Sequence, residues 1–268
     1  MNPIDTTFQQ LRQHSRKAFI PFLTAGDPNL PATVEIAKAL AKSGANILEI
    51  GFPYSDPIAD GPIIQASYTR ALDRGLRLDD IFTTVAKLKL DIPVVAMVSY
   101  SLIQRKGDAA FIERAQQSGF SGAVVPDLPF DESGELERVA AQADFKLIQL
   151  VTPTTPHERA AAIAKRSTGF LYCVSVTGIT GERDRLPDEV LAQLAFLRGQ
   201  TQLPLCVGFG ISRPAHVAML RDAADGVIVG SALVRKLEHA DRQPLVEVVA
   251  SVSELAAALA AALNPPSN

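Results

Sequence analysis

The chain has 268 residues, of which 47% are hydrophobic, and a formal net charge of −3 at pH 7. This length and apolar content predict a globular protein with a sizeable core, and the slightly negative charge excludes the basic surface that a nucleic-acid or anionic-membrane partner needs. The first 17 residues mix polar and charged side chains and lack the apolar core of a signal peptide, and we expect no apolar run of membrane-spanning length. A cytoplasmic location is therefore expected.

The chain begins with a short helical pattern and continues as an alternation of strands and helices. Ile4, Phe8 and Leu11 recur at helical spacing, which predicts an amphipathic helix that covers one end of the core. The eight apolar runs interpreted as strands are 18–24, 46–51, 93–98, 122–125, 146–151, 170–174, 204–208 and 226–229. The helical patterns are 31–43, 62–74, 79–89, 108–118, 133–143, 156–167, 187–198 and 214–223, then a short helix near 231–238 and a long one at 245–263.

The strands are continuous apolar runs, which is typical of parallel strands covered by helices. Repeated strand–helix units of about 30 residues favour an α/β fold of the (β/α)8 TIM-barrel type over a doubly wound open sheet. We expect residues 1–268 to form this single domain, with the extra N-terminal helix, a short extra helix after the eighth strand and a frayed tail at 264–268. Cys173 and Cys206 fall in apolar strands and are predicted to be reduced, buried thiols.

Carboxylates gather after the second strand, at the end of the barrel where catalytic groups of this fold lie. Glu49 lies inside an apolar strand, where burial would raise its pKa toward the range useful for proton transfer. Asp60 follows in a loop stiffened by prolines. With Tyr172 from the sixth strand as a helper, these side chains predict general acid–base chemistry. The alternatives are a structural ion pair for Glu49 and a helix cap for Asp60.

Glycine-rich turns follow the seventh and eighth strands. Gly208-Phe209-Gly210 and Gly230-Ser231 stand where barrels commonly hold a phosphate with main-chain N–H groups, and Ser231 would open a short helix there. These turns contain no Lys or Arg, so main-chain groups would supply most donors. Histidines and lysines avoid the carboxyl ends of the strands, so neither a metal site nor a Schiff base is predicted. The long loop 176–185 is typical of a lid.

Taken together, these motifs closely resemble the α subunit of tryptophan synthase. The resemblance runs along the whole chain, through residues 18–28, 49–62, 125–129, 176–181 and 208–211. It implies a retro-aldol cleavage of indole-3-glycerol phosphate to indole and glyceraldehyde 3-phosphate, with no cofactor in this chain. It also implies that Glu49 moves protons at indole C3 and at the glycerol hydroxyl, and that Asp60 holds the indole N–H. The substrate-binding residues expected beside Tyr172 are Phe22, Tyr100, Thr180, Gly181, Phe209, Gly210, Gly230 and Ser231.

The loop after the second strand is also expected to face a partner. Its prolines and apolar side chains predict a surface that a monomer rarely leaves uncovered. In the resembling family the partner is the pyridoxal-phosphate β subunit, in an assembly of two α and two β chains. The expected contacts are Pro53, Asp56, Pro57 and Pro129, and Leu102 stands where the family usually has Asn. The alternative functions are a stand-alone indole-releasing lyase and a non-catalytic, phosphate-binding regulatory barrel.

Overall fold

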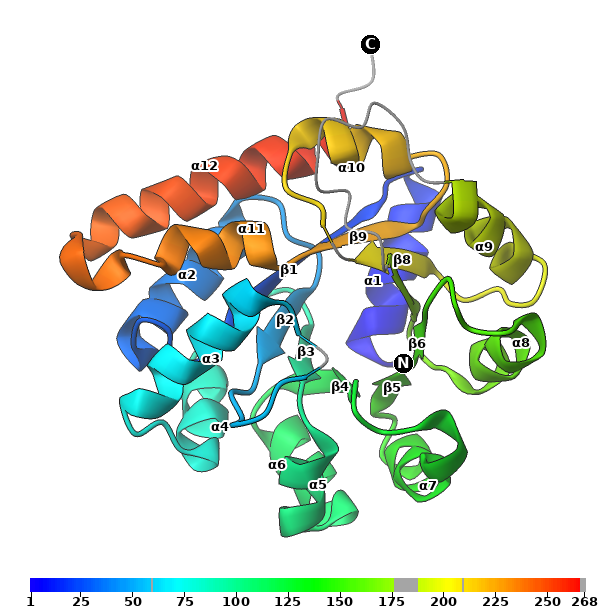
Figure 1. Cartoon of the computed structure of the whole chain (residues 1–268), viewed down its shortest axis with the longest axis horizontal. Helices are drawn as coiled ribbons and strands as arrows, with labels where there is room; N and C mark the ends of the chain where they lie inside the picture. Colours follow the sequence, from blue (N-terminus) through cyan, green and yellow to red (C-terminus); the bar gives the residue numbers. More distant parts are fainter. Residues whose placement is uncertain (59, 176–187, 209, 266–268) are drawn as a thin grey trace.

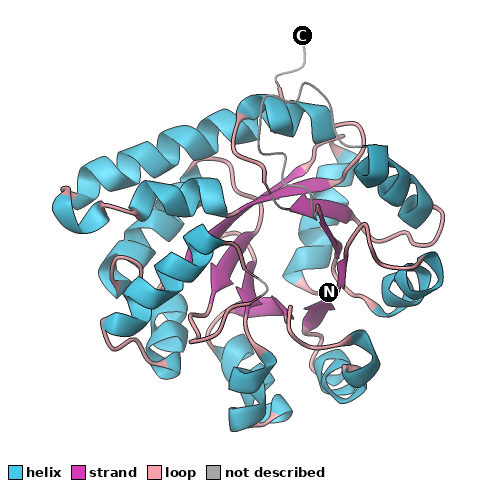
Figure 2. Cartoon of the chain, in the orientation of Figure 1, coloured by secondary structure: helices cyan, strands magenta, loops and turns pink. Residues whose placement is uncertain are grey.

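Short parallel strands form a ring at the centre of the fold, and helices surround it (Figures 1 and 2). The structure is a computed structural model that describes residues 1–58, 60–175, 188–208 and 210–265. The strands are β1 Ala18–Thr24, β2 Leu48–Gly51, β3 Val94–Met97, β4 Phe120–Val124, β5 Lys146–Ile148, β6 Leu150–Val151, β7 Leu171–Val174, β8 Leu205–Gly208 and β9 Gly226–Val229.

The strand order closes this sheet into a barrel. The order is β5-β4-β3-β2-β1-β9-β8-β7-β6, and neighbouring strands pair in parallel. The outermost members, β5 and β6, are consecutive pieces of one stretch of chain with only Gln149 between them, so the two edges of the sheet meet. This confirms the predicted (β/α)8 barrel.

The strand expected at 146–151 is nevertheless broken at Gln149, and its hydrogen bonds explain the break. The Gln149 N–H donates to Ser167 Oγ at 3.1 Å instead of to a neighbouring strand. Its side-chain amide donates to Glu137 Oε1 at 3.1 Å, which directs the side chain toward a surrounding helix. The Ser167 hydroxyl therefore takes the place of a neighbouring strand at the Gln149 N–H, whereas the Gln149 carbonyl still accepts from the Tyr172 N–H at 3.0 Å.

The helices follow the strands as the alternation predicts. They are α1 Pro3–Gln13, α2 Leu30–Lys42, α3 Pro62–Asp73, α4 Leu78–Ala86, α5 Tyr100–Lys106, α6 Asp108–Gln117, α7 Gly134–Gln142, α8 His157–Arg166, α9 Asp188–Arg198, α10 Pro214–Leu220, α11 Ser231–Val234 and α12 Leu245–Leu263. Helical turns of the 3-10 type lie at Phe130–Glu132, Arg235–Leu237 and Ala240–Arg242. Helix α5 was not predicted, because two turns are too short to show a helical period.

Helix α1 closes the amino-terminal end of the barrel, as the sequence predicts. Ile4, Phe8 and Leu11 pack in one cluster with inward-facing strand residues. Asn2 caps the helix, since its side chain accepts from the Ile4 N–H at 2.9 Å. A second layer of apolar side chains lies between the strands and the outer helices, and Cys173 and Cys206 are buried and unpaired, as predicted.

Helix α12 corrects one expectation from the sequence. Among the described residues, its 19 residues are long and apolar enough to cross a membrane by length and composition. In this fold α12 lies against α2 and α10 (Figure 1), and its buried face is Val248, Val252, Ala256, Leu259 and Leu263. Just beyond it, Asn264 exchanges hydrogen bonds of 2.7 and 2.9 Å with the Lys17 backbone, so the expected tail is tied to the barrel at its first residue.

Candidate active site

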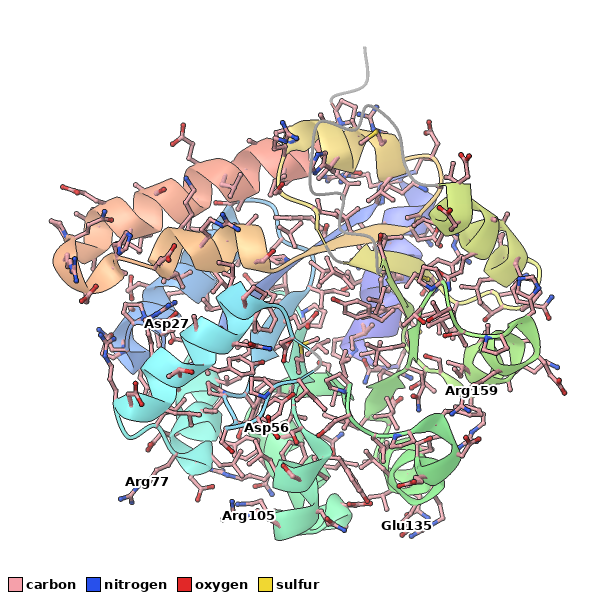
Figure 3. The ribbon with its side chains drawn as sticks, viewed as in Figure 1. Asp27, Asp56, Arg77, Arg105, Glu135 and Arg159 are labelled. Carbon is pink, nitrogen blue, oxygen red and sulfur yellow. The ribbon has the colours of Figure 1, made fainter. Side chains whose placement is uncertain are left out.

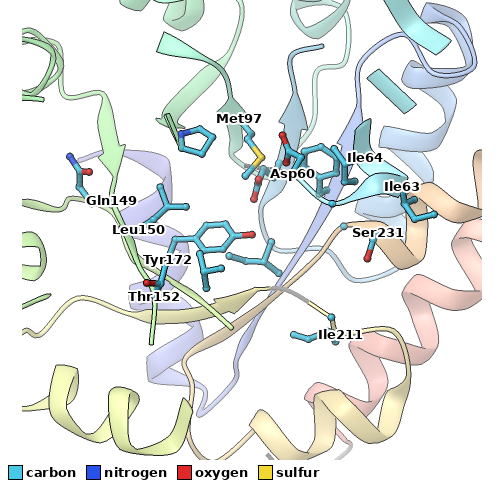
Figure 4. A pocket seen from close by; sticks show the side chains of 18 of the residues that line it. Asp60, Ile63, Ile64, Met97, Gln149, Leu150, Thr152, Tyr172, Ile211 and Ser231 are labelled. Carbon is cyan, nitrogen blue, oxygen red and sulfur yellow. The ribbon is translucent and has the colours of Figure 1, made fainter. Parts of the chain in front are cut away.

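A cavity of about 580 Å³ opens at the carboxyl ends of the strands (Figure 4). The predicted site residues that line it are Phe22, Glu49, Asp60, Tyr172, Gly210, Gly230 and Ser231. They come from β1, β2, β7 and the loops after β2, β8 and β9. The barrel therefore brings together side chains that lie up to about two hundred residues apart, as its strand order requires.

Glu49 lies in the middle of β2 with its side chain inside the barrel. It is only 1% exposed, and among the described residues neither carboxyl oxygen has a hydrogen-bond partner. Burial, and secondarily the charge of Asp60, raise the pKa of Glu49 to about 8. The carboxyl is therefore neutral at pH 7 and is able to donate a proton. A neutral acid without a partner does not fit the alternative of a structural ion pair.

Asp60 is held by its loop, not by the helix that follows. Gly61 occupies the cap position of α3 and no side chain caps that helix, so Asp60 does not act as the alternative cap. Gln65 instead donates to the Asp60 carbonyl at 2.8 Å and fixes the loop from α3. Burial, and then the charge of Asp127, raise the pKa of Asp60 to about 6, and the neighbouring Tyr54 hydroxyl partly offsets this rise. Asp60 is thus largely ionised at pH 7.

Tyr172 reaches into the cavity from β7, and the position of its hydroxyl depends on a glycine in the next strand. A Cβ atom at Gly208 would lie 2.5 Å from the Tyr172 hydroxyl, so only glycine leaves room for the ring. Figure 4 shows the ring pointing toward the side of the cavity that holds Asp60. Burial, with the charges of Glu49 and Asp60, raises the Tyr172 pKa well above its usual value, so this hydroxyl remains a donor.

The turns after β8 and β9 form another wall of the cavity. Gly210 and Gly230 line it together with Ser231, the first residue of α11. The Leu233 and Val234 N–H groups donate to the Gly230 carbonyl at 2.9 and 3.0 Å, which leaves the N–H groups of the first two helical residues, Ser231 and Ala232, to bind a ligand. Arg235, four residues after Ser231, also lines this wall and is exposed. The sequence prediction missed this guanidinium, although its spacing within one short helical segment was a usable signal.

One of the predicted substrate-binding residues, Tyr100, does not line this cavity, and three others lie outside the described part of the chain. Tyr100 is the first residue of α5, where its N–H donates to Asp127 Oδ1 at 2.8 Å, and it is not among the described lining residues. Thr180, Gly181 and Phe209 lie outside the described residues, as does the predicted lid at 176–185.

The outer side of the Asp60 loop borders a second hollow, of about 760 Å³, between α3, α4 and α5. Figure 3 shows Asp56, Arg77 and Arg105 on this part of the rim, and all three line the hollow. The predicted partner contacts differ in exposure: Asp56 and Pro129 are exposed, Pro57 is half-buried and Pro53 is buried. Pro53 therefore supports the loop from within, and a direct contact from it would require the loop to move.

The main cavity also extends beyond the predicted site, past Tyr172 toward α8. Thr155, Arg159 and Ile163 line this extension, which was not predicted from the sequence. Arg159 is paired with Asp131 at 2.8 Å. Within the part of the chain that the structure describes, no group of three or more His, Cys, Asp or Glu is arranged to hold a metal ion.

Comparisons with known proteins agree over almost the whole chain. The sequence model described as tryptophan synthase alpha chain matches residues 8–264. The tryptophan synthase alpha chain of Rhodopirellula baltica is 50% identical over 246 residues, which cover 90% of this chain and 88% of that protein. That of Synechocystis sp. is 47% identical over 240 residues, covering 88% and 91%. The crystal structure of tryptophan synthase subunit alpha from Legionella pneumophila superposes with a TM-score of 0.90 at 34% identity, covering 99% of this chain and 100% of that one. The chain therefore belongs to the tryptophan synthase alpha chain family.

Proposed function

We propose that this chain cleaves indole-3-glycerol phosphate to indole and glyceraldehyde 3-phosphate through Glu49 and Asp60. Family membership makes the chain a carbon–carbon lyase of tryptophan biosynthesis. The observation that carries the residue assignment is a pair of carboxyl groups in a single cavity, the buried Glu49 neutral and the half-buried Asp60 ionised at pH 7. Two carboxyl groups with different pKa values supply an acid and a charge stabiliser at the same pH.

The first step is proton transfer from Glu49 to indole C3. This transfer breaks the aromaticity of the five-membered ring and places positive charge at N1. The ring then serves as the electron sink for bond cleavage, so the chemistry does not require an imine. A pKa near 8 suits this role, because the acid carries its proton at neutral pH and gives it up readily.

The second step breaks the bond between indole C3 and the adjacent glycerol carbon. The Glu49 carboxylate takes the proton of the hydroxyl on that carbon, the C–O bond becomes a carbonyl, and the electron pair of the broken bond returns to the ring. The net change is the move of one proton from oxygen to carbon, and Glu49 ends in its starting state. Asp60, ionised and close to N1, stabilises the positive charge that develops between the two steps.

The remaining wall residues would position the substrate. The ring of Phe22 and the ring of Tyr172 would pack against the indole, and the main-chain groups at Gly210, Gly230 and Ser231 would bind the phosphate. Arg235 would add a charged donor at the same end. The expected contributions of Tyr100, Thr180, Gly181 and Phe209 stay predictions from the resemblance.

The family implies a β-subunit partner, and we propose that it covers the Asp60 loop. Ile58, at the tip of this loop, is 82% exposed, which is unusual for a large apolar side chain on a monomer. Asp56 and Pro129 flank the same rim and are also exposed. This proposal includes an assembly of two α and two β chains, with pyridoxal phosphate in the β chain. It also includes transfer of indole to that chain and a cytoplasmic location.

An indole-release assay tests this function. The purified chain is incubated with indole-3-glycerol phosphate, alone and with increasing amounts of a tryptophan synthase β subunit. We expect slow cleavage by the chain alone and a large increase as the β subunit binds. Equal rates with and without the β subunit, and no complex by light scattering, would favour a stand-alone lyase. Absence of indole under both conditions, with a complex present, would favour the regulatory barrel.

A further inference from the structure

The buried polar atoms that lack partners are concentrated in one place. Among the described residues, six of the eight buried side-chain atoms without a hydrogen-bond partner belong to five residues near the ends of β1 and β2. The acceptors are both oxygens of Glu49 and Oδ2 of Asp60, and the donors are the hydroxyls of Thr24, Tyr54 and Tyr68. Buried polar groups normally have partners, so such a cluster indicates contacts that are completed during function.

Tyr68 enters this cluster from α3 through a space left by Gly51. Its side chain is fully buried, and a Cβ atom at Gly51 would lie 2.7 Å from the Tyr68 hydroxyl. Gly51 lies two residues after Glu49 in β2, so both face the interior of the barrel. The Tyr68 hydroxyl therefore lies on the same side of β2 as the Glu49 carboxyl, about two residues further toward the cavity mouth.

Tyr54 approaches from the loop that carries Asp60. Its ring packs against that of Tyr68, with ring centroids 5.7 Å apart and planes tilted by 55°. Both rings belong to a small cluster with Phe22, Ile64, Met97 and Val234, which separates the two hydroxyls from bulk water. The packing fixes the rings, so only the hydroxyl hydrogens and the nearby carboxylates are free to adjust.

Asp60 is the charge to which both hydroxyls respond most strongly. Burial raises the pKa of each tyrosine, and the largest effect of a neighbouring charge on each comes from Asp60. The other charged or titratable groups that act on these hydroxyls or on Asp60 are Glu49, Asp56 and Asp127. None of these groups carries positive charge, and the two tyrosine hydroxyls are buried donors whose hydrogen bonds would favour the ionised form of Asp60.

We propose that Tyr54 and Tyr68 are positioning residues whose hydroxyls hold the Asp60 carboxylate ionised and oriented toward the substrate. Joining them to Asp60 Oδ2 would satisfy two buried donors and one buried acceptor together. Tyr54, on the same loop, would act on Asp60 more strongly than Tyr68. The inference rests on the proposed function, in which Asp60 must be ionised to stabilise charge at N1.

The test compares Tyr54→Phe and Tyr68→Phe with the unmodified chain in the complex with the β subunit. Each substitution removes a hydroxyl and keeps the ring, so packing is preserved. We expect kcat for indole formation to fall by on the order of tenfold, with KM within about twofold. The acidic limb of the kcat–pH profile should move to higher pH, because the carboxylate loses a donor that favours its charged form. Ser67→Ala is the control: it removes a buried hydroxyl from the same helix, which donates to Asp27 at 2.6 Å.

An activity-independent readout completes the test. Carbon-13 NMR of the Asp60 side-chain carboxyl, assigned by its loss in Asp60→Asn, should show a higher pKa in both phenylalanine variants and an unchanged one in Ser67→Ala. Unchanged kcat, pH limb and Asp60 pKa in Tyr54→Phe would overturn the inference, and that variant alone decides the matter if Tyr68→Phe fails to fold. If the unmodified chain does not form indole while the NMR shift is present, the proposed function fails and the positioning role stands.

Discussion

The two ends of the barrel differ in whether their polar side chains have hydrogen-bond or ion-pair partners. At the amino-terminal end, Asn2 donates to the Ser121 and Asp144 carbonyls at 2.9 and 2.6 Å, and Lys146 pairs with Asp5 at 2.7 Å. At the carboxyl end, the buried oxygens of Glu49 lack partners among the described residues. One end therefore contributes stability, and the other keeps unsatisfied groups that cost stability and serve the chemistry.

Replacement of Glu49 should have the largest effect on catalysis at the carboxyl end of the barrel. In Glu49→Gln the amide keeps the shape but cannot transfer a proton, so indole formation should fall on the order of 10³-fold or more. The measurement is the rate of indole release with the β subunit present. The control is Glu135→Gln, which changes an exposed glutamate on α7 (Figure 3) and should leave the rate unchanged. A rate for Glu49→Gln close to that of the control would show that Glu49 has a structural role and does not transfer the proton.

The same substitution should alter how stability depends on pH. The folded chain raises the pKa of Glu49 from 4.5 to about 8, so the folded state binds this proton more tightly than the unfolded state. Its stabilising contribution is complete below about pH 4.5 and is lost as the pH rises through about 8. Relative to the unmodified chain, Glu49→Gln should therefore gain about 4 kcal/mol of unfolding free energy between pH 5 and pH 9, measured by urea denaturation.

Asp60→Asn should have the next largest effect on catalysis. The amide cannot stabilise the positive charge at N1, and loss of such a preorganised group typically costs on the order of 10²- to 10³-fold in kcat. Single-turnover kinetics with saturating substrate measure this step. Asp73→Asn, at the exposed end of α3, is the matched control. Equal single-turnover rates for the two variants would remove Asp60 from the mechanism.

At the opposite end of the barrel, Ile4→Ala should affect stability and not catalysis. Ile4 is completely buried beneath the strands, and removal of its side-chain carbons should cost about 3 kcal/mol of unfolding free energy. Ile58→Ala, at the exposed tip of the Asp60 loop, should cost almost none in the isolated chain. Urea denaturation and indole release are measured on both. Loss of kcat in folded Ile4→Ala would show that the two ends are not separable.

The smallest predicted effect concerns Arg235. Arg235→Ala should raise KM for indole-3-glycerol phosphate by roughly fivefold and change kcat little, because an exposed cation at the phosphate end adds binding that is the same in ground and transition states. Lys236, the next residue along the chain, is also exposed but does not line the cavity. The KM of the control variant Lys236→Ala should therefore stay unchanged. Equal KM values for the two variants would confine phosphate binding to the main chain.

Much of the barrel could be predicted from the sequence because buried parallel strands are continuous apolar runs. Three features could not, each for a local reason. The break at Gln149 depends on a hydrogen bond from its N–H to the Ser167 hydroxyl, which local sequence patterns do not show. Helix α5 depends on the residues at its two ends: the Ser99 side chain caps its start, and Gly107, with a φ of +87°, ends it. Arg235 reaches the cavity only because α11 continues into a 3-10 turn.

The charged residues of the site could be predicted from the sequence, whereas the tyrosines beside them could not. Glu49 and Asp60 were recognised because charged residues beside an apolar strand need an explanation. Tyr54 and Tyr68 were not, because a tyrosine in an apolar helix or loop is most often a packing residue, and only the empty space over Gly51 shows where the Tyr68 hydroxyl points. Local sequence therefore identifies the charged groups, whereas the groups that position them depend on the fold.

Titration of Glu49 itself tests most directly whether the carboxyl end of the barrel keeps an acid protonated for catalysis. Carbon-13 NMR of the chain with labelled glutamate carboxyl groups, with the Glu49 signal assigned by its loss in Glu49→Gln, follows its protonation from pH 3 to pH 10. We expect a midpoint near 8, set by burial and by the charge of Asp60, and a downward shift of that midpoint in Asp60→Asn. A midpoint near the ordinary value of 4.5, unaffected by Asp60→Asn, would contradict the claim that this end of the barrel keeps an unpartnered acid protonated for catalysis.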